Sequence, residues 1–369
     1  MNIAMLNRAD SYTVRGGDTT QMMQLAKAME RLGSKVSFVT LNNLPRAWDF
    51  DVVHIFNRLT LQEMQDLLYS DLRTLPVVLT SNFWFDAGHW FFNAVRKQKK
   101  WLVADAVLGR SIAQRLYGKW QAARWKGGSK FLRLKQAMEQ CDAIITNSQT
   151  EISYLQRLFG LKTRFGVVPV AIDTNRYLDL PEKSVDFQDQ FHVSEFVLQV
   201  SRLQPNKNQL ALINALFDIP FPIVFVGQPS PYHLEYVRYC HERGEQRGNV
   251  YFTGYWPDED LPGVYASAKV HVLPSWAELP GIVSLEAGAA GCQVISTEIG
   301  CAKEYLGDLA GYCVPDNLSS IRQAVTSALD SQVPVALRET ILLQYTWEKA
   351  ATRLHAIYED ICHAGSKRR

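Results

Sequence analysis

Two glutamates with seven residues between them mark the stretch of sequence whose residue types best suit chemistry. Glu278 lies in a short loop after the apolar run 270–273, and Glu286 lies in a helix that we expect to begin near Gly281. Because a helix rises about 1.5 Å per residue, Glu286 would lie roughly 7–8 Å along the axis from Gly281. One carboxylate can then contact the reactive end of a ligand while the other contacts its far end. Taken alone, a solvent-exposed glutamate and a helix-capping glutamate fit the same spacing.

The start of that helix and a pair of cations are suited to bind phosphate. The backbone N–H groups near Gly281 and Ile282 lack intrahelical partners, and a helix N-terminus attracts anions. Arg202 follows the apolar run 196–200, and Lys207 comes five residues later. An arginine fork and a lysine point charge can clamp a diphosphate. A surface turn with two solvated cations is the alternative.

A glycine-rich loop near the N-terminus is a third candidate site. Gly16 and Gly17 lie in the loop 15–19, between an apolar run and a helical pattern. Two adjacent glycines allow the backbone to approach a ligand closely. The loop lacks the G-x-G-x-x-G fingerprint, so nicotinamide binding has little support. An ordinary strand–helix turn fits the loop equally well.

Short apolar runs that alternate with helical patterns would position these residues. Continuous apolar strands between helices are typical of parallel sheets buried on both faces, and right-handed crossovers then give doubly wound layers. A helical pattern over 22–32 is expected to end at Gly33. The expected strands are 2–6, 36–40, 52–56, 77–80, 143–146, 196–200, 223–226, 250–252, 270–273, 294–296 and 311–314.

The pattern therefore predicts an α/β protein with two doubly wound, Rossmann-like domains that face each other across a cleft. We expect an N-terminal domain over 1–170, a hinge over 171–194 and a second domain over 195–345. The hinge is polar, contains Pro181 and shows little periodicity. Ligands of open α/β sheets bind at the carboxyl ends of the strands, which would line the cleft.

Composition argues against several classes of protein. Hydrophobic residues are 47% and charged residues 21%, which argues against disorder. The formal net charge is only +2, whereas a protein of duplex DNA usually carries a larger excess. The six cysteines form no C-x-x-C pair, which favours reduced thiols in a cytoplasmic protein. No apolar run reaches the roughly 18 residues of a membrane span, so we expect any membrane contact to be peripheral, on the inner face.

One segment departs from this balance. Residues 87–135 hold twelve Lys or Arg and one acid, Asp105, so the segment carries a formal charge of +11. Three interpretations fit: contact with an anionic membrane surface, binding of single-stranded nucleic acid, or a solvated basic helix whose aromatic residues face the core. The residues that we expect to contact an acceptor or a membrane are Arg96, Lys97, Lys99, Lys100 and Trp101.

Together these elements resemble the retaining GT-B glycosyltransferases, a family of nucleotide-sugar users with a Glu-seven-Glu motif. The resemblance covers most of the chain, and the order and spacing of the matching segments are more specific than any one segment. The segments are GGD at 16–18, DVVHIFN at 51–57, CDAIITNSQTEISYL at 141–155, VVPVAID at 167–173, VSRLQPNKNQLALINAL at 200–216, the stretch 250–291 that contains both glutamates, and YTWEKAATRLHAIYEDI at 345–361.

The resemblance implies a role for each donor-side residue. Arg202 and Lys207 match the pair that holds the donor diphosphate. Glu286 matches the acid that binds the ribose hydroxyls, and Glu278 matches the acid that contacts the transferred sugar. The roles of the remaining positions are implied in the same way: Gly281 and Ile282 would supply amides to sugar and phosphate, Gly17 would belong to the loop that closes over the donor phosphate, and the helix 346–364 would cross back to brace the first domain.

The sequence departs from the family pattern on the acceptor side. Residues 81–86, SNFWFD, stand where a His-Asp pair is frequent, and Leu279-Pro280-Gly281 stands where Phe-Gly is common. The acceptor-side chemistry is therefore left unassigned. Pro280 has no N–H group, so it cannot donate to a phosphate.

The function implied is retaining, metal-independent transfer of a hexose from a UDP- or GDP-sugar to a hydroxyl of a glycan or lipid-linked acceptor. No cofactor and no metal are expected, because the two cations and the helix dipole can stabilise the leaving diphosphate. Nucleic acid is not an expected partner. A non-catalytic nucleotide-sugar-binding subunit, and a phosphorylase or epimerase on the same fold, are the alternatives.

Overall fold

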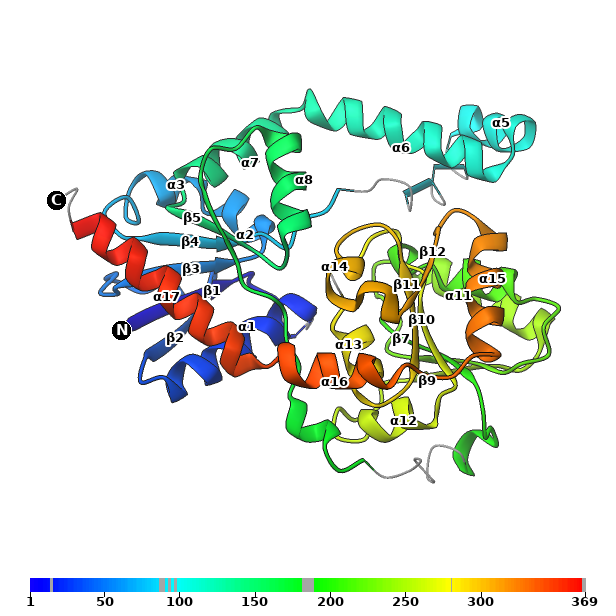
Figure 1. The fold of residues 1–369 in the computed structure, drawn as a ribbon. Helices are drawn as coiled ribbons and strands as arrows, with labels where there is room; N and C mark the ends of the chain where they lie inside the picture. The colour runs from blue at the N-terminus through cyan, green and yellow to red at the C-terminus, as the bar shows by residue number, and fades with distance from the viewer. Residues whose placement is uncertain are drawn as a thin grey trace. The chain divides into compact units, whose positions relative to one another are not determined.

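The protein contains two parallel sheets. The computed structural model describes residues 1–13, 16–85, 90–91, 94–95, 98–180, 189–279 and 281–366. The chain divides into two compact units. Unit 1 comprises Met1–Trp84, Ala123–Ile172 and Tyr345–Arg369, and unit 2 comprises Phe85–Ala122 and Asp173–Gln344. The predicted fold class, α/β with two doubly wound parallel sheets, is confirmed within the units (Figure 1).

Unit 1 is built on a six-stranded parallel sheet in the order β2-β1-β3-β4-β5-β6. Its central strands are buried along their whole length, as their unbroken apolar sequences predict. The strands are β1 (Asn2–Asn7), β2 (Lys35–Thr40), β3 (Val52–Phe56), β4 (Val77–Thr80), β5 (Ala143–Thr146) and β6 (Arg164–Val167). The helices are α1 (Gly17–Arg31), α2 (Arg58–Glu63), α3 (Gln65–Tyr69), α7 (Ser129–Gln140), α8 (Gln149–Phe159) and α17 (Trp347–Ser366).

Unit 2 repeats the arrangement with the strand order β12-β11-β10-β7-β8-β9. The strands are β7 (Val197–Val200), β8 (Ile223–Val226), β9 (Val250–Gly254), β10 (Val270–Leu273), β11 (Gln293–Thr297) and β12 (Gly311–Cys313). The helices are α5 (Lys99–Leu108), α10 (Gln209–Ala215), α11 (Leu234–Arg247), α12 (Leu261–Ser267), α13 (Ile282–Ala289), α14 (Ala302–Leu306), α15 (Leu318–Leu329) and α16 (Val335–Gln344), with 3₁₀ turns η2 (Thr174–Tyr177), η3 (Pro205–Lys207) and η4 (Gly307–Leu309). Helix α6 (Arg110–Lys126) begins in unit 2 and ends in unit 1.

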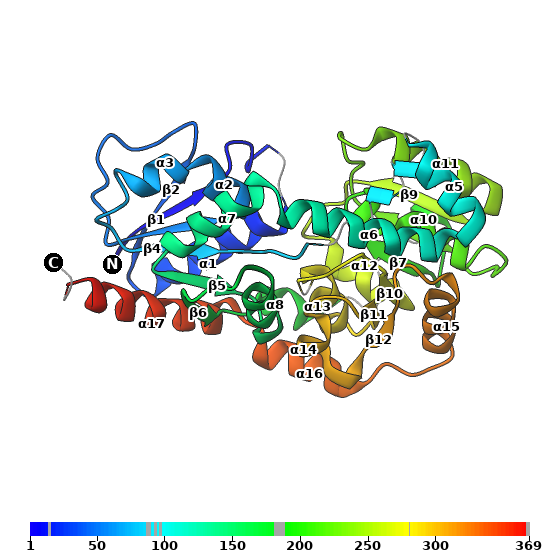
Figure 2. The ribbon, with the colours of Figure 1, turned by 90° about the horizontal axis from the view of Figure 1, so that it is seen from above.

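Helix α17 returns the C-terminal part of the chain to unit 1 (Figure 2). The backbone N–H of Ile172 donates to the carbonyl of Tyr345, and Arg164 forms an ion pair of 2.7 Å with Asp360. Tyr358 is fully buried and contacts His54 of β3. Helix α17 thus packs against the sheet of unit 1, which also contains the first strand of the chain.

Two features of the fold were not anticipated. Strand β6 was missed because its four residues are only partly buried at the edge of the sheet and carry a glycine, Gly166, instead of a continuous apolar run. The contacts of residues 85–122 group them with unit 2, whereas the sequence-based division assigned all of 1–170 to one domain. None of the helices in the described part of the chain is both long and apolar enough to cross a bilayer.

The aromatic residues of the basic segment form a small core of their own. Phe91 and Tyr117 are buried together with Ala113, and Trp101 and Trp120 pack against them. The ring centroids of Trp101 and Tyr117 lie 5.0 Å apart, and those of Trp101 and Trp120 lie 5.8 Å apart. This cluster packs α5 against α6, and the Trp101 ring is partly buried against it. The expectation that Trp101 contacts an acceptor or a membrane stays a prediction.

Candidate functional site

Lys207 and Glu278 meet at the carboxyl ends of β7 and β10. The Nζ of Lys207 donates to Oε1 of Glu278 at 2.6 Å. The Glu278 side chain is 5% exposed and that of Lys207 is 23% exposed, so the pair lies at the wall of the unit rather than in open solvent. The structure therefore brings together two of the residues that the sequence singled out, although 70 residues separate them along the chain.

Buried glutamines fix the backbone that carries the two cations. Gln199, at the end of β7, donates from Nε2 to the carbonyl of Lys207 at 2.7 Å. Gln209, in the first turn of α10, donates from Nε2 to the carbonyl of Arg202 at 2.9 Å. Trp276 donates its backbone N–H to the carbonyl of Asn206 at 2.9 Å, which ties this loop to the one that holds Glu278. The backbone at Arg202 and at Lys207 is therefore held by hydrogen bonds from buried side chains.

Glycines allow the Glu278 loop to pack closely. Gly300 has φ +110°, and a Cβ there would lie 2.1 Å from the carbonyl oxygen of Glu278. Gly281 has φ +87°, and a Cβ there would lie 3.1 Å from Oε2 of Glu278. The backbone that precedes α13 thus runs directly beside the Glu278 carboxylate. Gly281 is the N-cap of α13 and Ile282 its first residue, which fits the expected helix start.

Glu286 lies on α13, the helix that follows the Glu278 loop. The hydroxyl of Tyr265 donates to Oε2 of Glu286 at 2.9 Å. Burial raises the pKa of Glu286 above its ordinary value, while the hydrogen bond from Tyr265 and the charge of Arg176 act in the opposite direction and Asp258 adds to the rise. A carboxylate in this setting is well suited to accept hydrogen bonds from hydroxyl groups.

A neutral histidine lies beneath the site. His271 of β10 is fully buried, and burial together with the charge of Lys207 lowers the pKa of His271 to about 3. Its ring lies 5.8 Å from that of Tyr265, centroid to centroid. His271 therefore stays uncharged at neutral pH and adds no positive charge to that of Lys207.

Two residues near Glu286 were missed by sequence reasoning. Tyr265 of α12 is a hydrogen-bond donor to Glu286, and Arg176 of η2 contributes a positive charge close enough to affect the pKa of Glu286. The Nη2 atom of Arg176 is buried and meets no acceptor among the described residues. The segment 167–173 matches the family pattern, but Arg176, three residues beyond it, belongs to no recognisable spacing.

The remaining predicted residues lie elsewhere. Gly17 is the first residue of α1 and belongs to unit 1. Lys99, Lys100 and Trp101 lie on α5 of unit 2, where Nζ of Lys100 lies 4.2 Å from the ring centroid of Trp120. Arg96 and Lys97 fall outside the described residues.

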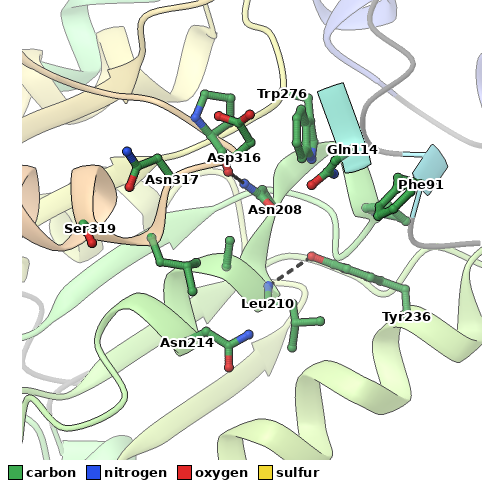
Figure 3. Close-up of a pocket in the computed structure, with 14 residues that line it drawn as sticks. Phe91, Gln114, Asn208, Leu210, Asn214, Tyr236, Trp276, Asp316, Asn317 and Ser319 are labelled. Carbon is green, nitrogen blue, oxygen red and sulfur yellow. Dashed lines mark hydrogen bonds between the residues drawn. The ribbon is translucent and has the colours of Figure 1, made fainter. Parts of the chain in front are cut away.

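A large pocket of about 860 Å³ opens in unit 2 beside the loops that carry Lys207 and Glu278 (Figure 3). The pocket is lined by Asn208, which follows Lys207 in the sequence, and by Trp276, two residues before Glu278. Phe91 covers one side of the pocket. Asn208 already donates to the carbonyls of Pro274 and Pro315, and the Tyr236 hydroxyl accepts from the N–H of Leu210 at 3.1 Å. The pocket thus presents mainly apolar groups.

Comparison with known families relates this arrangement to an established group of proteins. The family model "Glycosyltransferase Family 4" matches residues 40–176, and "Glycosyl transferases group 1" matches residues 183–341. The chain belongs to the group 1 glycosyltransferases. Lys207, Glu278 and Glu286 all lie within the second match, and the two matches together span most of the chain.

Two relatives of this glycosyltransferase are mannosyltransferases by name. The chain is 25% identical to the O-antigen chain mannosyltransferase B of Escherichia coli over 239 residues, which are 61% of this chain and 62% of that protein. It is 29% identical to the GDP-mannose-dependent alpha-(1-6)-phosphatidylinositol monomannoside mannosyltransferase of Mycobacterium tuberculosis over 242 residues, 60% of this chain and 62% of that protein. The matches thus span less than two thirds of each relative.

A solved structure defines the fold of the glycosyltransferase. Sucrose-phosphate synthase from Thermosynechococcus elongatus superimposes with a TM-score of 0.75 at 17% identity, and the match covers 99% of this chain and 100% of that one. At this identity the likeness establishes the fold alone. The two six-stranded units described above form the GT-B fold, as the sequence predicted.

In unit 1 of the glycosyltransferase, a buried carboxylate lies at the carboxyl ends of β4 and β5. Glu151 accepts hydrogen bonds from the Ser81 hydroxyl at 2.7 Å and from the Asn147 N–H at 3.0 Å. Asn147, Asn82 and Gln21 close a ring of side-chain amide hydrogen bonds beside it. Burial raises the pKa of Glu151, although these hydrogen bonds oppose the rise. This network occupies the place where the sequence lacks the family's His-Asp pair.

Proposed function

We propose that this glycosyltransferase moves a hexosyl group from a nucleoside-diphosphate sugar to a hydroxyl of a glycan or lipid-linked acceptor, with retention of anomeric configuration. The contact between Lys207 and Glu278 carries the proposal. It puts a cation suited to phosphate beside an acid suited to sugar hydroxyls, with Arg202 on the adjoining loop and Glu286 on the helix that follows.

The proposed donor is a UDP- or GDP-sugar, with GDP-mannose first. The names of both relatives above favour a mannosyl donor, and one of them names GDP-mannose. In this arrangement Glu286 binds the ribose hydroxyls, and Arg202 and Lys207 bind the diphosphate. The N–H groups of Gly281 and Ile282 bind sugar and phosphate oxygens, and Gly17 of unit 1 belongs to the loop that closes over the donor phosphate.

The reaction breaks the bond between the anomeric carbon and the diphosphate. Negative charge develops on the leaving group, where Arg202, Lys207 and the N-terminal dipole of α13 stabilise it. The acceptor hydroxyl attacks from the face that the diphosphate leaves, and a phosphate oxygen takes its proton. In this proposal Glu278 holds sugar hydroxyls, as the resemblance implies, and a double displacement with the Glu278 carboxylate as nucleophile is the rival mechanism.

Metal independence is part of the proposal and rests on the two cations. The sequence contains Asp-x-Asp triplets at 49–51 and 258–260. Among the described residues, no three His, Cys, Asp or Glu side chains are grouped to hold a metal ion. We predict that transfer continues in EDTA. Loss of transfer that Mg²⁺ or Mn²⁺ restores would contradict this part of the proposal.

A screen of purified protein against GDP-mannose, GDP-fucose, UDP-glucose and UDP-galactose tests the proposal. A ligand at about 100 times its dissociation constant stabilises the folded state by roughly 2.7 kcal/mol, which a thermal shift detects. Release of nucleoside diphosphate upon addition of glycan or lipid-linked acceptors then measures transfer. Donor binding without turnover would favour a binding subunit, phosphate-dependent turnover a phosphorylase, and conversion of the donor sugar without an acceptor an epimerase.

A further inference from the structure

Helices α5 and α6 present aliphatic side chains to solvent. On α5, Leu102 is 53% exposed, Val103 is 59% exposed and Val107 is 75% exposed. On α6, Ile112 and Leu116 are 55% and 45% exposed at helical spacing. Contiguous exposed aliphatic residues mark an interaction surface more often than scattered single ones do.

The aromatic cluster that joins α5 to α6 does not include the exposed aliphatic residues of these two helices. The aromatic cluster of Phe91, Trp101, Tyr117 and Trp120 already holds α5 to α6, and Arg115 joins α6 to Asp316 with Nε at 2.6 Å from Oδ2. Helices α5 and α6 are therefore held together, and their exposed aliphatic side chains are accessible to a partner.

The surroundings of this face are basic. Lys99, Lys100, Lys119, Arg124 and Lys126 are all exposed on α5 and α6, and Asp105 is the sole acid of either helix. A partner that covers the aliphatic residues must accept this positive charge. A second copy of the same surface would bring like charges together, which is unfavourable. Single-stranded nucleic acid is recognised by stacking on exposed aromatic rings, whereas the rings on α5 and α6, those of Trp101, Tyr117, Trp120 and Trp125, pack against other aromatic rings.

We infer that the aliphatic face of α5 and the first half of α6 is a docking surface for an anionic lipid bilayer. Val103, Val107, Ile112 and Leu116 enter the boundary between headgroups and acyl chains, and the flanking lysines bind lipid phosphates. Exposed aliphatic side chains supply apolar insertion and flanking lysines supply electrostatic attraction, the two contributions that hold a protein on an anionic membrane surface. The inference keeps the expected contacts of Lys99 and Lys100 and adds the aliphatic residues, while Trp101 packs in the aromatic cluster.

Vesicle flotation of the full chain tests the inference without reference to sugar transfer. The probes are vesicles of phosphatidylcholine alone and of phosphatidylcholine mixed with phosphatidylglycerol. The test variant carries Val103→Ser and Val107→Ser. The matched control carries Val335→Ser and Leu343→Ser on α16 of the same unit, where the exposed fractions are 74% and 65%. Circular dichroism and melting temperatures establish that both variants are folded.

We expect the wild-type protein to bind the anionic vesicles at low salt and the neutral vesicles weakly. The test variant should lose about tenfold in partitioning, and the control should bind like the wild type. Lys99→Glu combined with Lys119→Glu should weaken binding to anionic vesicles only.

Three results would overturn the inference. The first is no binding of the wild type to anionic vesicles at low salt. The second is equal binding by the test variant and the wild type, which would move the contact to another surface. The third is a wild-type dimer that the test variant converts to a monomer, which would assign the face to a second copy. Since no donor or acceptor takes part, failure here is distinguishable from failure of the proposed transferase activity.

Discussion

The ammonium group of Lys207 lies 2.6 Å from Oε1 of Glu278, at the point where the strands β7 and β10 end side by side. The pair joins a group suited to phosphate with a group suited to sugar. In the absence of a ligand, each neutralises the other in a largely buried position. A bound diphosphate would compete with Glu278 for the lysine, so this contact couples donor binding to the orientation of the carboxylate.

Replacement of Lys207 by methionine should slow transfer by about 10²–10³, the usual effect of removing one group that stabilises developing charge. The Glu278 carboxylate would also lose its partner at a site where only 5% of its side chain is exposed. The measurement is kcat with saturating donor. Lys269→Met, at a lysine of the same unit whose side chain is 40% exposed, serves as the control. A Lys207→Met enzyme with wild-type kcat would remove Lys207 from the chemistry.

Gly17→Ala separates ligand approach from folding. A Cβ at Gly17 meets no atom within 4 Å, so the melting temperature should not change. If the donor phosphate approaches this backbone closely, the added methyl group raises the KM for donor. Gly127→Ala, whose Cβ would have no contact shorter than 3.9 Å, provides the control. An unchanged KM for the Gly17 variant would argue that the loop does not contact the donor.

Gly300→Ala should lower both stability and activity. Its Cβ would lie 2.1 Å from the Glu278 carbonyl oxygen, so the Glu278 loop must shift. Backbone strain of this kind costs of order 1–3 kcal/mol. Gly291→Ala is the matched control, since Gly291 also has a positive φ, +81°, but no atom within 4 Å of its Cβ. Equal losses of melting temperature in the two variants would exclude the collision as the cause.

Donor affinity should depend on the protonation of Glu286. Because the pKa of Glu286 is raised, its carboxylate takes up a proton at a higher pH than an ordinary glutamate, and it then accepts hydroxyl hydrogen bonds less well. The Kd for nucleotide sugar should therefore rise as the pH falls through this raised pKa. Titration calorimetry from neutral to acidic pH measures the effect, and Glu286→Gln should bind weakly without the pH dependence.

Arg176→Met provides a control for that interpretation. The charge of Arg176 holds the pKa of Glu286 down, so its removal should move the loss of donor affinity to a higher pH. A purely structural role for Arg176 would change affinity equally at every pH. An unshifted pH profile would contradict the assigned relationship between Arg176 and Glu286.

The sequence predicted most of the sheet architecture because parallel strands buried on both faces leave unbroken apolar runs. Strands such as β3, β4, β8 and β10 are buried throughout and were identified within a residue of their ends. Strand β6 escaped because a partly buried edge strand with a central glycine carries no such run. The contact between Lys207 and Glu278 was predictable to the extent that both residues follow strands of one parallel sheet.

Other features depend on tertiary contacts that leave no local pattern. The influence of Arg176 on Glu286 and the hydrogen bond from Tyr265 arise between segments far apart in sequence. In the basic segment, composition could not decide which side chains face inward. Phe91, Trp101, Tyr117 and Trp120 pack together because aromatic rings bury much apolar area, whereas Val103, Val107, Ile112 and Leu116 are exposed.

The central claim is that Arg202 and Lys207 clamp a diphosphate, and comparing the affinities for GDP and GMP tests it most directly. The two ligands differ by one phosphate, the group that the cations should bind. The wild type should bind GDP tighter than GMP by about tenfold or more, and the variant with Arg202→Ala and Lys207→Ala should bind the two nearly equally. If GDP-sugars fail the screen, UDP and UMP replace the pair. Equal affinities in the wild type, or an undiminished preference for the diphosphate in the variant, would contradict the account.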